Sequence, residues 1–151
     1  MWTPSDLPSY DGPLLLDTHA WIWHLQDDDT QWARGTSPLL ERSGAHGHLM
    51  VSDMSYWEVA VKAAKGKLRL SADVTAWLQR AETAPDIRYR PVTRPVLLHS
   101  TRLAGTSPGD PVDRMLIAMA QIDGVPLVTV DRQIIEYARE YGSTPVVDVR
   151  A

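Results

Sequence analysis

The sequence predicts an α/β fold with three layers, in which helices cover both faces of a central, mainly parallel sheet. Short apolar runs alternate along the chain with amphipathic segments of helical period, and strands that alternate with helices form right-handed βαβ units. The apolar runs are also nearly continuous, as expected for strands that are buried on both faces.

The first half of the chain predicts two strands and four helices. Residues 13–17 and 48–52 are the apolar runs expected as strands, and the first of them ends on Asp17. Helices are expected at residues 18–25, at residues 37–42, across the apolar stripe of residues 57–64, and from Ser71 to the residue before Pro85. Helical spacing supports the last two, Gly66 suits a helix C-cap, and Ser71 is a good N-cap.

The second half of the chain repeats the alternation. Strands are expected at residues 87–92, 126–131 and 145–147, and helices at residues 95–104, 112–123 and 134–141. Asp110 followed by Pro111 is a strong start signal for the helix 112–123, and Gly124 ends it. This helix is apolar on nearly every side, so we expect it to be buried.

The composition is that of one globular domain. The chain has 151 residues, of which 44% are hydrophobic and 23% charged, close to the average of soluble proteins. We therefore expect a single domain over residues 1–151, with residues 1–12 as a polar, proline-rich N-terminal lead-in. The net charge of −4 argues against holding nucleic acid by bulk charge alone, so a nucleic-acid role must be local or metal-assisted.

Several classes of protein are excluded by what the sequence lacks. Cysteine is absent, which excludes disulfides, thiolate chemistry and cysteine-based zinc sites. No stretch approaches the roughly 20 apolar residues of a membrane span, and the N-terminus lacks the basic and apolar regions of a signal peptide. We therefore expect a cytoplasmic protein with no membrane partner.

Acidic residues stand at one edge of the predicted sheet. Asp17 ends the first strand, Asp131 ends the strand 126–131, and the carboxyl ends of parallel strands share one edge of a sheet. Glu58 lies in the first turns of the helix after the second strand, and Asp110 and Asp113 open the buried helix. Carboxylates from four segments are therefore expected to converge on one spot.

Each acid also has a structural explanation. Asp17, Asp110 and Asp131 could simply cap the helices that follow them. Ser55-x-x-Glu58 has the form of a capping box, and Glu58 could pair with Lys62 one turn later. Asp113 is the hardest to explain in this way, because it precedes an almost wholly apolar helix and has no basic residue at i+4.

Taken together, the acids indicate a divalent metal ion. Carboxylates held close together repel and raise one another's pKa unless a cation holds them. Hard oxygen ligands suit Mg²⁺ or Mn²⁺. Such an ion lowers the pKa of a bound water, orients a phosphate and stabilises the developing charge, which together allow hydrolysis of a phosphodiester bond.

Four stretches carry a specific resemblance. They are LLLDTHAWIW at 14–23, SDMSYWEVAVKAAKGKLRL at 52–70, GDPVDRMLIAMA at 109–120 and LVTVDRQI at 127–134. With these four stretches in this order, the chain resembles PIN-domain ribonuclease toxins of the VapC-like group, which belong to type II toxin–antitoxin systems. The resemblance implies a PIN-like arrangement, an endoribonuclease that depends on Mg²⁺ or Mn²⁺, an RNA substrate, a homodimer, and a cognate antitoxin protein that blocks the site.

The resemblance also assigns roles to residues. It implies that Asp17, Glu58, Asp113 and Asp131 are catalytic and line the metal site, with Asp17 and Asp113 as direct ligands and the other two acting directly or through water. Candidates for supporting roles are Asp110, Thr18, Thr129 and Ser52. Arg114 and Arg132 follow two of the acids, and we interpret them as candidate RNA contacts.

Two other functions remain open at this stage. The acids could belong to a non-catalytic module that binds a partner or senses phosphate. A receiver-like version would need an acid pair at the first strand and a lysine after a late strand, and neither is visible. The second alternative is a DNA-directed nuclease of the same fold, which a substrate assay would separate.

Overall fold

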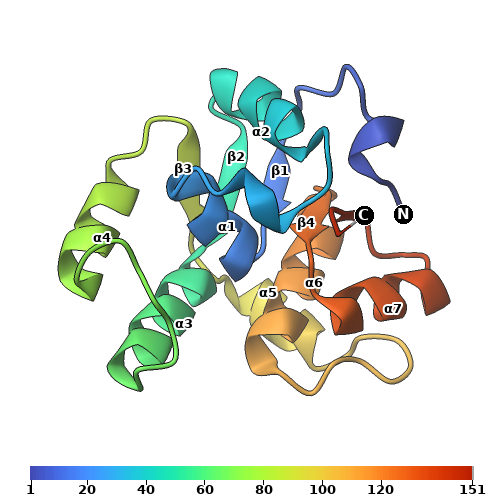
Figure 1. Ribbon diagram of the computed structural model, residues 1–151. Helices are drawn as coiled ribbons and strands as arrows, with labels where there is room; N and C mark the ends of the chain where they lie inside the picture. Colours follow the sequence, from blue (N-terminus) through green and yellow to red (C-terminus); the bar gives the residue numbers. More distant parts are fainter. Residues whose placement is uncertain (151) are drawn as a thin grey trace.

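The computed structural model describes residues 1–150, and a parallel sheet of five strands forms the centre of the molecule in the order β3-β2-β1-β4-β5 (Figure 1). The strands are β1 (Leu14–Leu16), β2 (Leu49–Ser52), β3 (Ile87–Arg90), β4 (Leu127–Thr129) and β5 (Val146–Asp148). All four neighbouring pairs are parallel, with Leu15 of β1 opposite Met50 of β2 on one side and Leu127 of β4 on the other. The predicted α/β fold is confirmed.

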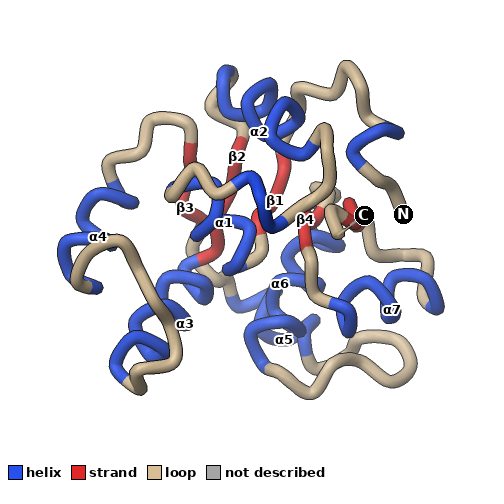
Figure 2. The backbone as a smooth tube through the Cα atoms, viewed as in Figure 1, coloured by secondary structure: helices blue, strands red, loops and turns tan. Residues whose placement is uncertain are grey.

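Helices connect these strands and surround the sheet (Figure 2). They are α1 (Thr18–Leu25), α2 (Thr36–Ala45), α3 (Asp53–Ala64), α4 (Val74–Glu82), α5 (Arg94–Ser100), α6 (Pro111–Asp123) and α7 (Arg132–Glu140), with short 3-10 helices η1 (Pro4–Asp6) and η2 (Asp29–Gln31). Within residues 1–150, none of the helices has the length and apolar character that crossing a bilayer requires.

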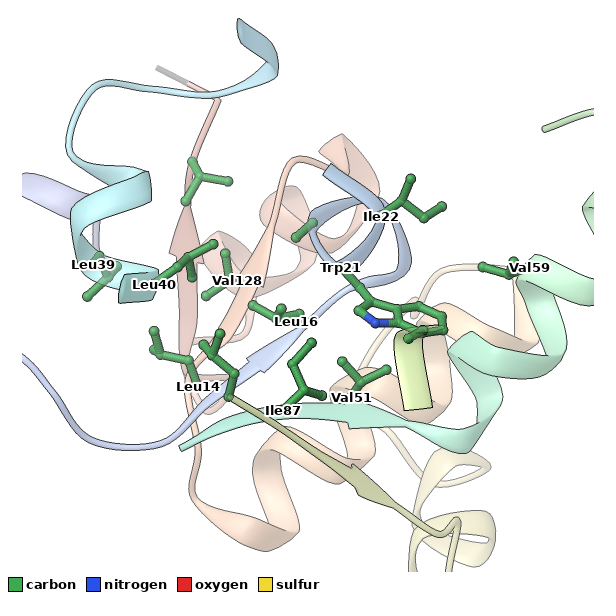
Figure 3. Packing of buried hydrophobic residues seen from close by; sticks show 14 of the residues in the cluster. Leu14, Leu16, Trp21, Ile22, Leu39, Leu40, Val51, Val59, Ile87 and Val128 are labelled. Carbon is green, nitrogen blue, oxygen red and sulfur yellow. The ribbon is translucent and has the colours of Figure 1, made fainter. Parts of the chain in front are cut away.

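Two hydrophobic cores lie on opposite faces of the sheet, because successive side chains of a strand point to opposite sides. Leu14 and Leu16 pack with residues of α1, α2, α3 and α4, and Trp21 lies at the centre of this core (Figure 3). Leu15 and Met50 pack on the other face with residues of α5, α6 and α7. The sheet is therefore the middle of three layers, as the sequence predicted.

Trp21 provides the aromatic volume that phenylalanine supplies in other cores, since the chain has no phenylalanine and six tryptophans. Its indole ring is fully buried. It meets Trp77 edge to face at 5.1 Å between ring centres and Tyr89 at 5.9 Å, which is a favourable geometry for aromatic pairs. These contacts fix α1 and α4 on the same face of the sheet.

Several sequence-based element boundaries need correction, and the strands expected at 87–92 and 126–131 are shorter in the structure, at Ile87–Arg90 and Leu127–Thr129. Asp73, not Ser71, caps α4, because its carboxylate accepts hydrogen bonds from the N–H groups of residues 75 and 76. Helix α5 ends at Ser100 instead of residue 104. At this end the hydroxyls of Ser100 and Thr101 donate to carbonyl oxygens one turn earlier, and these bonds compete with the backbone hydrogen bonds that would continue the helix. Helix α2 extends on both sides of the predicted residues 37–42.

The N-terminal lead-in packs against the domain through backbone hydrogen bonds. Trp2 pairs in parallel beside β5, donating from its N–H to Val146 O at 2.9 Å and accepting from the N–H of Asp148 at 2.8 Å. The Arg42 guanidinium donates to Leu7 O at 2.9 Å and to the carbonyl oxygen of residue 10 at 3.2 Å. The lead-in therefore covers the outer edge of β5.

The strand order creates a crevice at the carboxyl ends of β1 and β4. From the central strand β1 the chain moves outward to β2 and β3, then crosses back to β4 and β5 on the other side. The connections after β1 and β4 therefore diverge, and ligands of parallel α/β sheets bind at such a point.

Candidate metal centre

A pocket of about 80 Å³ opens at this crevice. Its lining residues are Asp17, Thr18, His19, Glu58, Lys62, Asp110, Asp113, Leu116 and Asp131. The structure thus brings the four acids expected to line a metal site, together with Asp110 and Thr18, around one space. They come from the start of α1, from α3, from the start of α6 and from the start of α7.

Three of these acids also cap helices, so the structural explanation for them is correct as well. Asp17 Oδ1 accepts from the N–H of Ala20 at 2.7 Å. Asp110 and Asp131 each accept, through Oδ1, from two N–H groups at 2.8 to 3.1 Å. These bonds fix the side chains, while the Oδ2 atoms of Asp110 and Asp131 accept none within residues 1–150 and stay available to a ligand.

Thr129 connects the acids at the ends of β1 and β4. Its hydroxyl is fully buried, donates to Asp17 Oδ2 and accepts from the N–H of Asp131 at 2.9 Å. Thr129 is not among the residues that line the pocket. It holds the Asp17 carboxylate in one orientation.

The start of α3 shows that the capping-box explanation of Glu58 is wrong. Ser52 caps α3 by accepting from the N–H of Met54 at 3.1 Å, and Glu58 lies in the second turn. Ser55 instead accepts a buried hydrogen bond of 3.0 Å from the Thr18 hydroxyl, which joins α3 to α1. The expected pair with Lys62 is present, with 3.7 Å between Lys62 Nζ and Glu58 Oε2.

The raised pKa of Asp113 shows how strongly burial and mutual repulsion act on the carboxylates of the pocket. Burial first, and then the carboxylates of Asp131, Asp110, Glu58 and Asp17, raise the pKa of Asp113 to about 8. Burial also raises the pKa of Asp17, against hydrogen bonds from the residues at 129 and 20 that lower it. The pocket therefore carries more negative charge than its surroundings compensate, and a bound cation would relieve this.

The donor chemistry of the pocket fits a hard divalent cation. Within residues 1–150 no group of three or more His, Asp or Glu side chains is arranged to hold a metal ion as it stands. Mg²⁺, however, keeps several waters and binds through one or two carboxylates, so a closed ligand shell is not required. His19 is the one imidazole that lines the pocket, which does not suit zinc.

The two arginines that we interpret as candidate RNA contacts lie outside the lining of the pocket. Neither Arg114 nor Arg132 lines it: Arg114 Nη2 donates to Gly109 O at 3.3 Å, and Arg132 is exposed at the first position of α7. Lys62 and His19 line it instead. The spacing of Lys62 four residues after Glu58 was the available sequence signal, since such residues share one face of a helix.

Comparison with known proteins identifies the class. Residues 14–140 match the PIN domain family, so the chain belongs to this family. The chain is 31% identical over 121 residues to Ribonuclease VapC22 of Mycobacterium tuberculosis, a match that covers 80% of this chain and 88% of that protein. It is therefore a homologue of a VapC ribonuclease, as the resemblance of its motifs indicated.

Solved structures share the fold. VapBC2 from Rickettsia felis, bound to a DNA fragment from its promoter, matches with a TM-score of 0.66 and 12% identity over 90% of this chain and 98% of that one. DNA-bound VapBC from Salmonella typhimurium matches with a TM-score of 0.63 and 18% identity over 91% and 98%. At these identities the likeness establishes the PIN-like fold.

Proposed function

We propose that this protein is a divalent-metal-dependent endoribonuclease that acts as the toxin of a toxin–antitoxin pair. One observation carries the proposal: four segments of the chain bring five carboxylates to one pocket at the crevice of a parallel sheet, with one lysine among them. The homology to a named ribonuclease supports RNA as the substrate.

In this proposal Asp17 and Asp113 bind the ion directly, and Glu58 and Asp131 bind it directly or through water. The ion, Mg²⁺ or Mn²⁺, would supply an activated water and offset the charge of the phosphodiester. The chain supplies orientation: the Thr129 hydroxyl and the cap hydrogen bonds hold the carboxylates in place.

The Asp113 carboxyl couples the charge of the pocket to occupancy by a cation. With a pKa of about 8, it holds a proton at neutral pH while no cation offsets the neighbouring carboxylates. A cation favours its ionised form, so binding releases this proton. Metal affinity should therefore increase with pH up to about the pKa of Asp113.

The partners follow from the same family. The structural neighbours are VapBC assemblies, which supports a cognate antitoxin protein that covers the pocket of this chain. We expect a homodimer that acts in the cytoplasm, where RNA is available. Copurification of a small protein encoded beside the toxin gene, with loss of nuclease activity in the complex, tests the antitoxin.

The central test is cleavage of RNA by the purified protein with Mg²⁺ or Mn²⁺ and then with excess chelator. Activity should require the ion and should fall about a hundredfold or more in Asp17→Asn and in Asp113→Asn. Asp73→Asn is the matched control, because it makes the same chemical change at a helix cap outside the pocket. Asn caps helices about as well as Asp, so folding should be retained.

Three outcomes would contradict the proposal. Cleavage that persists in chelator removes the role of the ion. Cleavage of DNA in preference to RNA favours the DNA-directed nuclease. Absence of divalent-ion binding by calorimetry, together with absence of cleavage, favours a non-catalytic module.

A further inference from the structure

An RNA phosphate that enters the pocket meets strong repulsion. Five carboxylates line the space, and each phosphodiester brings a further negative charge. Of the residues that line the pocket, Lys62 is the one with a permanent positive charge. Arg114 and Arg132, although adjacent in sequence to two of the acids, do not line it. Lys62 is therefore the side chain placed to attract the substrate.

The contact between Lys62 and Glu58 leaves the ammonium group free to do this. The 3.7 Å between Nζ and Oε2 is an ion pair but is too long for a hydrogen bond. The Lys62 side chain is 36% exposed, whereas that of Glu58 is 12% exposed. Within residues 1–150 the Lys62 ammonium makes no hydrogen bond, so its three donors face the pocket and solvent.

From this geometry we propose that Lys62 binds an RNA phosphate at the mouth of the acidic pocket. The inference rests on the proposed ribonuclease function and adds a substrate-binding residue to it. An ammonium group is a compact phosphate-binding charge. The flexible four-carbon stem would let Lys62 leave Glu58 when RNA enters, and the Glu58 carboxylate would then be free to help hold a divalent cation.

The proposal predicts effects of opposite sign on the two ligands. Removing the positive charge of Lys62 weakens binding of anionic RNA and strengthens binding of a divalent cation, because like charges near the carboxylates repel the cation. A lysine whose sole role was to orient Glu58 would, when removed, weaken the binding of both ligands or of neither. The signs of the two changes therefore distinguish the roles.

The experiment compares Lys62→Met and Lys62→Gln with the charge-retaining Lys62→Arg. Lys65→Met is the matched control, because Lys65 follows the same helix, is exposed and lies outside the pocket. The neutral variants should raise KM for RNA about tenfold with kcat within about threefold, as expected for loss of a binding contact. Lys62→Arg should have a KM close to that of the wild type, and Lys65→Met should match the wild type in both KM and kcat.

Two readouts do not depend on turnover. The slope of log K against log salt for binding a non-cleavable RNA should be about 0.7 smaller in the neutral variants, because one phosphate contact is lost. Titration of Mn²⁺ by calorimetry, without RNA, should show tighter binding than in the wild type. Thermal unfolding should be close to that of the wild type, because Lys62 is partly exposed and its 3.7 Å contact with Glu58 is not a hydrogen bond.

The failures are separable. If the wild type cleaves RNA and the neutral variants keep its KM and salt slope, the assignment of Lys62 is wrong while the ribonuclease proposal stands. If the neutral variants bind both RNA and Mn²⁺ more weakly, Lys62 is a structural partner of Glu58, and the inference is again overturned. A wild-type protein that cleaves no RNA with any divalent ion contradicts the proposed function itself.

Discussion

Replacing Asp113 with asparagine should make the metal-free protein more stable, although it removes a residue of the proposed active site. Asp113 lies in the first turn of α6 but does not cap it, because Asp110 does. Asparagine has nearly the same size, so the substitution removes mainly charge. Burial and four neighbouring carboxylates raise the pKa of Asp113 to about 8, and the neutral amide avoids that conflict.

The size and sign of the effect follow from linkage. The unfolded chain releases the Asp113 proton near pH 3.8, and the folded protein keeps it to about pH 8. The folded state therefore holds more protons in this window, so this group's contribution to stability falls as pH rises from about 4 to about 8. At about 1.36 kcal/mol per pKa unit the ceiling is about 6 kcal/mol, and since solvent screens this partly exposed group we expect about 2–3 kcal/mol.

Urea unfolding with chelator, at several pH values between about 4.5 and 9, measures this contribution. The difference in unfolding free energy between Asp113→Asn and the wild type should be near zero at the acidic end and grow toward pH 8. Mn²⁺ should remove most of the difference by stabilising the wild type alone, and Asp73→Asn should show no such trend. A difference that stays constant with pH, or a variant less stable at pH 8, would refute this account of the crowded carboxylates.

Three further substitutions test how the site and fold are supported. Thr129→Val removes the hydrogen bonds to Asp17 and Asp131, so it should lower the free energy of unfolding by about 1–3 kcal/mol and weaken Mn²⁺ binding. Thr129→Ser should restore both stability and Mn²⁺ binding. A calorimetric Mn²⁺ titration that is unchanged in Thr129→Val would contradict the role of Thr129 in holding these carboxylates. Arg42→Ala should lower the free energy of unfolding by about 1–2 kcal/mol and speed proteolysis of the N-terminal lead-in. Equal proteolysis rates in the variant and the wild type would show that Arg42 does not hold the lead-in against the domain. Trp21→Ala should lower stability by about 3–5 kcal/mol in thermal or urea unfolding, and a smaller loss would mean that the core closes around the gap.

The fold was predictable because burial on both faces leaves a direct mark on the sequence. The run Leu14–Leu16 is buried without interruption, as its composition indicated, and the parallel order follows from helices between strands. The start of α4 was not predictable, because Ser71 and Asp73 are both good caps. The hydrogen bonds of Arg42 to carbonyls more than 30 residues away in sequence leave no local pattern at all.

The acids of the site were easier to place than its basic residues. Asp17 and Asp131 follow strands, and strand ends share an edge, so topology alone brings them together. Arg114 is adjacent to Asp113 in sequence, but successive residues of a helix point about 100° apart, so adjacency does not predict a shared face. Lys62 is four residues from Glu58, a spacing that returns to the same face.

The dual use of aspartate as helix cap and pocket residue has an evolutionary consequence. Asp17, Asp110 and Asp131 each begin a helix, and asparagine begins helices equally well. A change from an aspartate codon to an asparagine codon needs only one altered base. In the proposed ribonuclease, one altered base at any of these three positions would therefore remove a carboxylate from the pocket while the helix keeps its cap.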